Sequence, residues 1–175
     1  MQYQNSYHSP VGEILLTADD TALTGLWFQG GKYDANHPGQ EQEEKRTPAL
    51  AQAREWLTIY FSGRQPHFRP PIHISGTSFQ LAVWNILQNI PYGETVTYGE
   101  IAKEIAAQRG LSRMSAQAVG GAVGHNPLSI IIPCHRVVAA NGSLAGYAGG
   151  IERKLQLLTL EGVDISRLHM PAGMH

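Results

Sequence analysis

The amino-acid sequence predicts an α/β chain in two parts, a small N-terminal α/β part followed by a mainly helical C-terminal part. Apolar and polar residues alternate over residues 11–28, which is typical of strands. A proline-rich connector covers residues 64–77, and beyond it apolar residues recur at helical spacing. We therefore expect an N-terminal α/β domain over residues 1–75, a C-terminal domain over residues 76–165 and a mobile tail over residues 166–175.

The composition is that of an ordinary globular protein. Of the 175 residues, 42% are hydrophobic and 15% are charged, which argues against disorder and allows a sizeable core. One cysteine excludes an internal disulfide and makes a cysteine-based zinc site unexpected. We find no signal-peptide pattern at the start and no apolar stretch of the roughly 20 residues that span a membrane. A cytoplasmic location is expected.

The charge balance gives no global attraction to nucleic acid, since the net charge is −1. DNA binding would need a local basic patch, and it would be weak and fall steeply with salt. Basic residues do gather around the segment that leads to the cysteine: Lys103, Arg109, Arg113 and Arg136.

The sequence of the N-terminal part predicts a hairpin, a loop and a helix. Asp19-Asp20 breaks the alternation over residues 11–28, which is typical of a β-hairpin. Residues 30–45 are rich in glycine, proline and charge, and we expect a long solvated loop there. A helix should begin at Thr47-Pro48 and stop at Gly63. The connector is expected to hold one short strand, at residues 72–74.

Three helices are predicted next. The first begins after Thr77-Ser78, the second at a capping box over residues 97–100, and the third covers residues 115–124. The last two form a helix-turn-helix candidate, although most such pairs are only packed core helices. The glycines of residues 120–124 give the third helix a low propensity. Bare backbone on an exposed face lets a large partner approach closely, which favours DNA contact.

The single cysteine lies in an unusual setting. Residues 129–132 form an apolar run that predicts a buried strand, and Pro133 would end its pairing and hold the backbone at Cys134. A lone cysteine is more often an inert buried side chain. Here the following histidine and arginine, and glycine-rich segments on both sides, favour a nucleophile, with Glu161 behind His135 as the residue that orients its ring.

The chain after the cysteine is expected to hold a hairpin and a helix. Asn141-Gly142 predicts a two-residue turn between strands over residues 136–140 and 143–147. Residues 146–150 form a flexible, small-residue segment beside the cysteine. A closing helix begins near Ile151 and ends at Glu161-Gly162.

At Pro133-Cys134-His135-Arg136 the sequence resembles the O6-alkylguanine-DNA alkyltransferases, also called methylated-DNA–protein-cysteine methyltransferases. The resemblance extends over most of the chain, with further motifs in the family's order at residues 79–84, 90–93, 98, 118–122, 126–127, 146–150 and 157–162. It implies a ribonuclease-H-like N-terminal domain and a C-terminal DNA-binding and alkyl-acceptor domain with a winged-helix-like helix-turn-helix.

The resemblance also implies a reaction. The recognition helix enters the minor groove of double-stranded DNA, and the damaged nucleotide is rotated out of the stack. Cys134 then takes the alkyl group from O6-alkylguanine irreversibly, so each molecule acts once. O4-alkylthymine is left open as a second substrate. No cofactor, no metal and no obligate protein partner is implied, and a monomer is expected.

Roles for single residues follow from the resemblance. Cys134 is the acceptor, His135 a base acting through water, and Glu161 orients it. Asn126 supports this network, and Tyr98 crowds the phosphate and donates a proton to the departing guanine. The backbone of Val137 and Ala148 binds the guanine edge, Lys154 steadies that loop, and Arg136 is a structural tie between the two parts. The remaining DNA- and base-binding positions are Gln117, Ala118, Gly120, Gly121 and Tyr147.

One position departs from the family pattern. Gln117 stands where an arginine usually fills the gap left by the flipped base, so weaker DNA affinity is expected. Two other function classes stay in view. One is a lesion-binding protein that transfers nothing, but in such relatives the cysteine is replaced. The other is a Cys-His hydrolase, for which no convincing oxyanion hole is seen.

Overall fold

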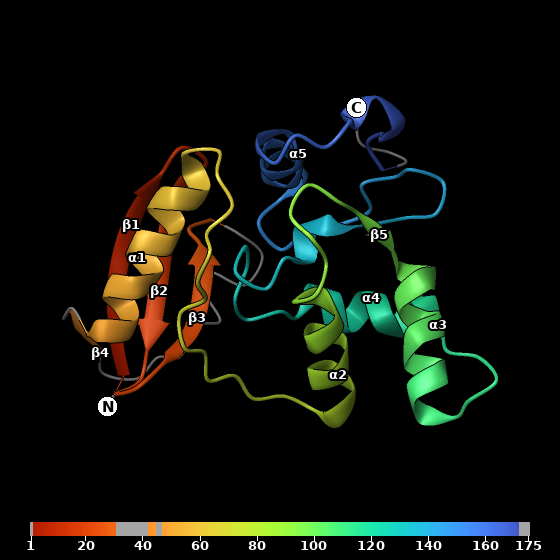
Figure 1. The fold of residues 1–175 in the computed structure, drawn as a ribbon, viewed down its shortest axis with the longest axis horizontal. Coiled ribbons are helices and arrows are strands. Elements are labelled where there is room, and N and C mark those ends of the chain that lie inside the picture. The colour runs from red at the N-terminus through yellow and green to blue at the C-terminus, as the bar shows by residue number, and fades with distance from the viewer. Residues whose placement is uncertain (1, 31–41, 45–46, 172–175) are drawn as a thin grey trace. The chain divides into compact units, whose positions relative to one another are not determined.

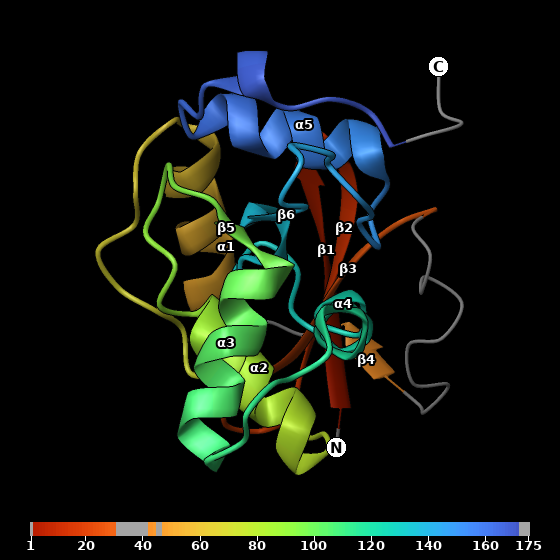
Figure 2. The same cartoon turned by 90° about the vertical axis from the view of Figure 1, so that its right-hand side faces the viewer.

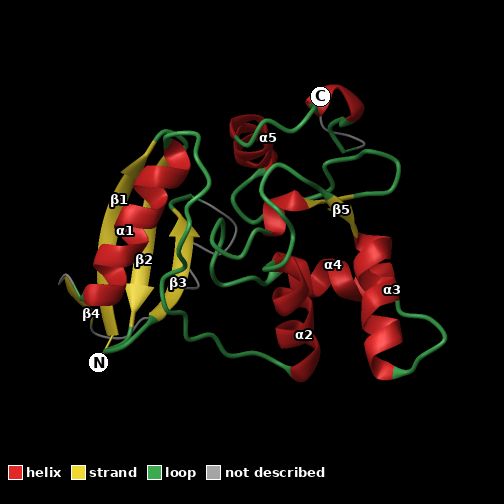
Figure 3. Ribbon diagram, in the orientation of Figure 1, coloured by secondary structure: helices red, strands yellow, loops and turns green. Residues whose placement is uncertain are grey.

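The computed structural model describes residues 2–30, 42–44 and 47–171, which fold as two compact units. The first unit holds the chain up to Ile74 and the segment Pro127–Ile131, and the second holds Ser75–Asn126 and the chain from Ile132 onward. Figure 3 shows strands gathered in the first unit and mainly helices in the second. The predicted α/β class is confirmed. Across these described ranges, no helix is both long and apolar enough to cross a membrane.

The first unit is a sheet covered by one helix (Figure 1). Its strands lie in the order β3-β2-β1-β4, antiparallel except for the β1–β4 pair. In the register Ile14 lies opposite Phe28 and Leu16 opposite Leu26, and all four side chains are buried. The predicted hairpin is thereby confirmed, whereas β1 has no counterpart among the predictions. The strands are β1 (Gln2–Ser9), β2 (Gly12–Ala18), β3 (Leu23–Phe28) and β4 (Gln42–Glu44).

Helix α1 (Pro48–Phe61) begins as its sequence predicts. The side chain of Thr47 accepts a hydrogen bond from the backbone N–H of Leu50, and Pro48 occupies the first turn, where its missing N–H leaves no gap in the hydrogen bonding. The buried face carries Leu50, Ala53 and Leu57. Burial of this face holds the helix on the sheet.

Two predictions for the first unit need correction. The loop expected over residues 30–45 contains strand β4, which pairs parallel with β1, while residues 31–41 and 45 lie outside the described residues. The strand expected over residues 72–74 is reduced to a single bridge between Ile72 and Leu23. Leu128 makes a similar bridge to Leu26, which is why a short, late piece of the chain belongs to this unit.

The described residues of the second unit form four α-helices, and a side chain caps the N-terminus of each of the first three. The hydroxyls of Thr77, Thr97 and Ser115 each accept a backbone N–H in the first turn, and Gln80 completes a capping box at the first. The elements are α2 (Ser78–Leu87), β5 (Val96–Thr97), α3 (Tyr98–Arg109), α4 (Ala116–Gly124), η2 (Cys134–Arg136), β6 (Val137–Val138), α5 (Ile151–Leu160) and η3 (Ile165–Arg167).

Helices α3 and α4 form the predicted helix-turn-helix. Gly110 ends α3 in the left-handed conformation, with φ 65°, and allows the chain to turn toward α4. In Figure 2, α4 is seen nearly end-on while α3 runs up the view, so the two helices cross. The indole N–H of Trp84 donates to the carbonyl of Ala122 at 2.8 Å, which fixes α4 to α2.

The prediction of a strand over residues 129–132 is wrong. These residues form turns: the N–H of Ile131 donates to the carbonyl of Ser129 at 2.8 Å, across Ile130 at φ 70°. Positive φ is strained for a β-branched residue. All four side chains are nevertheless buried. The apolar run therefore indicated burial of these residues and not an extended backbone. Cys134 lies in the short helix η2 and not at the end of a strand.

The hairpin and tail predictions are also wrong in part. A turn does form at Asn141-Gly142, but β6 pairs with β5, and Ser143 forms a bridge with His169. Residues 166–171, expected to be mobile, include most of η3 and this bridge. The last four residues of the expected tail lie outside the described residues.

Candidate functional site

The site is built around Cys134, which the second unit holds in the interior. Only 4% of its surface is exposed. Pro133 precedes it with φ −81° and ψ 65°, and the N–H of Cys134 donates to the carbonyl of Ile132 at 2.8 Å. The side-chain amide of Asn126 donates to the same carbonyl at 2.7 Å. Both bonds fix the backbone that carries the thiol.

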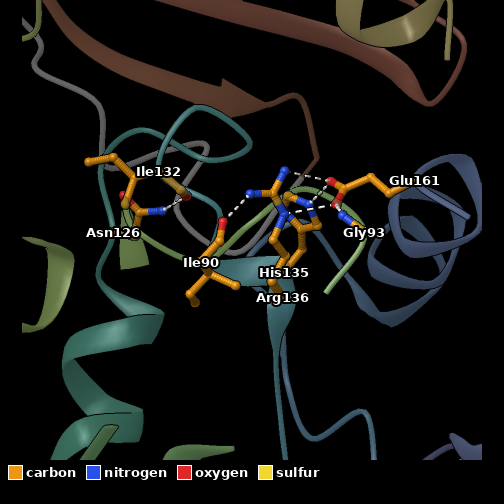
Figure 4. A network of polar contacts seen from close by, with 7 residues as sticks. All are labelled: Ile90, Gly93, Asn126, Ile132, His135, Arg136 and Glu161. Carbon is orange, nitrogen blue, oxygen red and sulfur yellow. Dashed lines mark hydrogen bonds and ion pairs between the residues drawn. The ribbon is translucent and has the colours of Figure 1, made fainter. Parts of the chain in front are cut away.

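The carboxylate of Glu161 is the centre of a buried polar network (Figure 4). Nε2 of His135 lies 2.5 Å from Oε2, and Nε of Arg136 donates to Oε1 at 2.8 Å. The guanidinium adds a second bond to Oε2 at 3.2 Å, and the N–H of Gly93 donates to Oε1 at 3.0 Å. Four donors therefore satisfy a carboxylate that is fully removed from solvent.

Electrostatics in this network favour a neutral imidazole beside an ionised carboxylate. Burial alone would raise the pKa of Glu161, but hydrogen bonds and charges from His135 and Arg136 lower it to about 2. Burial lowers the pKa of His135, against the effect of Glu161. A buried neutral histidine with an anchored ring is suited to accept a proton.

Burial holds the thiol itself in its neutral form. Burial raises the pKa of Cys134, while a hydrogen bond from Asn126 and the charge of Lys154 act in the opposite direction. Lys154 is fully buried, and its ammonium donates to three carbonyls, those of Val137 at 2.6 Å, Leu144 at 2.5 Å and Gly146 at 3.2 Å. Burial lowers the Lys154 pKa to about 8.

Tyr98 lies at the first position of α3, next to this group of residues. Burial and the charge of Cys134 raise the pKa of Tyr98 to about 12, and a backbone hydrogen bond from Gly146 opposes this. A Cβ added at Gly120 would lie 3.8 Å from the Tyr98 ring, so α4 approaches the tyrosine closely. The hydroxyl keeps its proton at neutral pH and can serve as a donor.

The DNA- and base-binding residues expected from the sequence separate into two groups. Gln117, Ala118 and Gly121 are exposed on α4, with no heavy atom within 4 Å of a Cβ built on Gly121. Tyr147 and Ala148 are half-buried near η2, and the Tyr147 ring meets that of His135 edge-on at 6.4 Å. The carbonyl of Val137, expected to bind the guanine edge, already accepts a hydrogen bond from Lys154.

Arg136 differs from expectation in two respects. It is 8% exposed, so it adds little to a surface basic patch, whereas Lys103, Arg109 and Arg113 are exposed. Its hydrogen bonds run to Glu161 and to the carbonyl of Ile90 at 2.7 Å, so the tie that it makes lies inside the C-terminal unit.

Main-chain groups of the site were missed by the sequence reasoning. The N–H of Gly93 and the carbonyls of Ile90, Leu144 and Ile132 complete the polar networks. No side-chain pattern reveals such groups. The one available signal is Pro91-Tyr92-Gly93, since a glycine at φ 80° turns its N–H toward the carboxylate.

Comparisons with known proteins agree over nearly the whole chain. Residues 2–74 match the family model of the 6-O-methylguanine DNA methyltransferase ribonuclease-like domain, and residues 78–163 match that of its DNA binding domain. A methylated-DNA–protein-cysteine methyltransferase of Mycolicibacterium paratuberculosis is 43% identical over 166 residues, which cover 95% of this chain and 93% of the relative. A protein of the same name from Methanosarcina acetivorans is 43% identical over 160 residues, 91% of this chain and 98% of the relative.

A solved structure gives the same agreement in three dimensions. The crystal structure of Mycobacterium tuberculosis OGT in complex with DNA is 40% identical to this chain. It aligns with a TM-score of 0.79 and covers 97% of this chain and 96% of its own.

Proposed function

The chain belongs to the 6-O-methylguanine DNA methyltransferase family, and from this membership we propose that Cys134 is the residue that accepts the alkyl group. The protein repairs double-stranded DNA by transferring an alkyl group from O6-alkylguanine to its own cysteine. One observation carries the assignment to Cys134: the family transfers the alkyl group to a cysteine, and the sequence contains a single one.

The chemical step is an in-line displacement at the alkyl carbon. The sulfur of the thiolate forms a bond to this carbon, and the bond from carbon to O6 of guanine breaks, with its electron pair going to guanine. The thiol proton passes to His135 through a water molecule. In the net reaction one proton ends on the dealkylated guanine, which stays in the DNA. The product is a thioether, which neutral water or amines do not displace, so each molecule reacts once.

His135 and Glu161 supply the base for this step. The imidazole is neutral in its buried position, as the lowered pKa indicates, so it has a lone pair for the thiol proton. Once protonated, the imidazolium lies 2.5 Å from an ionised carboxylate. This arrangement lowers the free energy of the state in which the thiolate is ready to attack.

Three more residues act on the attacking thiolate and on the departing guanine. Asn126 and the charge of Lys154 stabilise the thiolate, as their opposing effects on its raised pKa indicate. Tyr98 keeps its proton, since burial raises its pKa to about 12, and donates to guanine as negative charge develops on the base.

Helix α4 binds the minor groove of the duplex. This groove is about 6 Å wide, so a helix with bare backbone approaches it more closely than one with long side chains. Gly121 is exposed, with open space where a Cβ would stand, and Gly120 lies next to Tyr98. Gln117, the second residue of α4, is exposed and of a size to occupy the gap that the flipped nucleotide leaves.

The buried thiol implies that the site opens when DNA binds. With 4% of its surface exposed, Cys134 does not meet a purine until the segment around it moves. Residues 145–150 are small except for Tyr147, and Ala145 has a positive φ of 61°. Small residues and local strain lower the cost of such a movement. We further propose a monomer in the cytoplasm, where a lone thiol stays reduced.

Intact mass after incubation with a methylated duplex tests the assignment. We expect the protein mass to rise by one CH₂ group and then stop, with no change on unmethylated duplex and none for Cys134→Ser, which should still bind the lesion. Binding without any mass change would instead favour a lesion-binding protein. Continued turnover without an adduct would favour a hydrolase, and transfer to Cys134→Ser would place the acceptor elsewhere.

A further inference from the structure

The segment after α5 forms a folded element that we call the C-terminal clasp, residues 164–169. Asp164 starts it, since its carboxylate accepts from the N–H of Ser166 at 3.0 Å and from the Ser166 hydroxyl at 2.6 Å. Helix η3 follows, and Leu168 packs against the buried cluster of Leu144, Ile151 and Leu158. The family model ends at residue 163, so the clasp lies beyond the matched residues.

The clasp holds the loop of residues 141–146 through the main chain. The N–H of His169 donates to the carbonyl of Gly142 at 3.0 Å, and the N–H of Leu144 donates to the carbonyl of His169 at 2.9 Å. The approach is close, because a Cβ on Gly142 would lie 2.5 Å from the carbonyl oxygen of Arg167. Gly142 also has φ 90°, so glycine is needed here both for the close contact and for the backbone conformation.

Leu144 connects the clasp to the reactive thiol. Its N–H is bound by the clasp, and its carbonyl accepts from the Lys154 ammonium at 2.5 Å, the shortest of the three Lys154 bonds. The third acceptor, Gly146, also has a backbone hydrogen bond to Tyr98. A shift of Leu144 would therefore move or release the ammonium that acts on Cys134.

We propose that the C-terminal clasp positions Lys154 for alkyl transfer by fixing the carbonyl of Leu144. The proposal rests on the proposed function, in which Cys134 attacks as a thiolate. The groups that face this thiol are Lys154 from α5, Tyr98 from α3, Asn126 after α4 and the neighbouring His135 with its partner Glu161. Of these, Lys154 is the one whose charge favours the thiolate and whose place depends on the clasp.

Gly142→Ala tests the clasp, with Gly63→Ala as the matched control. Both glycines have a similar positive φ, 90° and 87°, but a Cβ on Gly63 meets nothing within 4 Å and that residue lies in the other unit. Because Cys134 is the only cysteine, the pH dependence of its alkylation by a small thiol reagent gives the midpoint at which this residue becomes a thiolate. We expect Gly142→Ala to raise the thiolate midpoint by about one pH unit, so that the transfer rate at neutral pH falls roughly 10-fold.

The outcomes separate a positioning role from a structural one. If Gly142→Ala lowers the melting temperature but leaves the thiolate midpoint and the pH profile of transfer where they are, the clasp is only structural and the proposal is overturned. Should Gly142→Ala not fold, Leu168→Ala is measured in its place, with the same expectation and the same criterion. A wild-type protein that titrates normally but transfers nothing would contradict the proposed function and not the clasp.

Discussion

Nε2 of His135 lies 2.5 Å from Oε2 of Glu161, and neither side chain has any surface exposed to solvent. With its pKa lowered to about 2, the carboxylate is ionised and can only accept. The proton must therefore reside on Nε2, which leaves Nδ1 as the nitrogen with a lone pair. The glutamate thus fixes the tautomer as well as the orientation of the proposed base.

Glu161→Gln should impair both stability and transfer. The neutral amide leaves Arg136 buried without its counter-charge, and breaking a buried ion pair in this way costs about 3–5 kcal/mol. It also places an N–H₂ group among four donors. We expect a lower melting temperature and a transfer rate reduced roughly 100-fold. Glu152→Gln, at an exposed position of α5, is the control and should behave as wild type; equal losses in both variants would contradict the role of Glu161.

Acid should destabilise the protein through the same pair. The pKa of His135 is lowered on folding, so below its ordinary value of 6.5 the unfolded chain binds a proton that the folded one does not. Glu161 acts with the same sign, because its stabilising effect is present above 4.5 and is lost as the pH falls toward 2. Urea unfolding midpoints should fall in two stages as the pH is lowered. His135→Ala should remove much of the first stage, and an unchanged profile in that variant would count against a buried neutral imidazole.

His135→Ala should slow transfer by roughly 100-fold or more while DNA binding is retained, since the variant removes the proton acceptor and none of the residues proposed to contact DNA. Single-turnover transfer followed by intact mass gives the rate, and titration of a methylated duplex in a Cys134→Ser background gives the affinity. His67→Ala is a suitable control, because His67 is exposed in the connector. A normal transfer rate in His135→Ala would remove this residue from the mechanism.

Much of the helical framework could be predicted from the sequence because its signals are local. Thr47, Thr77 and Thr97 each cap the helix that follows, at the expected distance from its first apolar residues. The site was also indicated in part, since His135 and Glu161 form the expected pair and Cys134 directly precedes His135. What the local pattern could not give was the backbone around Cys134. Residues 129–132 are apolar because they are buried, and burial is compatible with turns as well as strands.

The missing parts of the prediction depend on contacts between distant residues. The hairpin expected around Asn141-Gly142 keeps one bond, from the N–H of Ala139 to the carbonyl of Ser143, and Ser143 then forms a bridge with His169, 26 positions further along the chain. The tail predicted to be mobile over residues 166–175 is held where it is described, because Leu168 packs on a buried cluster and main-chain bonds join His169 to Gly142 and Leu144. Lys154 is expected from the family resemblance to steady the loop at the guanine edge, but the three carbonyls that hold its ammonium in the interior have no side-chain pattern that reveals them.

Gln117→Arg should tighten binding to alkylated duplex. Gln117 is exposed on α4, so an arginine there adds a charge at the surface proposed to meet the phosphates. One exposed charge contact is worth up to about 1 kcal/mol, which corresponds to an affinity gain of roughly 5-fold. The slope of log K against log salt should steepen by about one. Gln156→Arg adds the same charge on exposed α5 and should leave both quantities nearly unchanged; equal or weaker affinity for Gln117→Arg would contradict the contact.

Gly121→Ala should stabilise the free protein and weaken its DNA complex. Gly121 lies inside α4, is exposed and has open space for a Cβ, so alanine adds about 1 kcal/mol of helix propensity without a clash. In the minor groove the same methyl group stands between backbone and DNA. We expect a higher melting temperature, a lower affinity for methylated duplex, and an unchanged rate of Cys134 with a small soluble alkylating agent, because α4 does not supply the base.

A graded series makes this prediction sharper. Gly121→Val should weaken DNA binding further than alanine does, since its side chain is bulkier while its helix propensity is lower. Thr159→Ala raises helix propensity at an exposed position of α5 and serves as the control for stability alone. Its melting temperature should rise with no change in affinity. If Gly121→Ala and Gly121→Val bind duplex as tightly as wild type, then α4 does not approach DNA through this face. The presence of small residues in the helix would then need an explanation other than DNA binding.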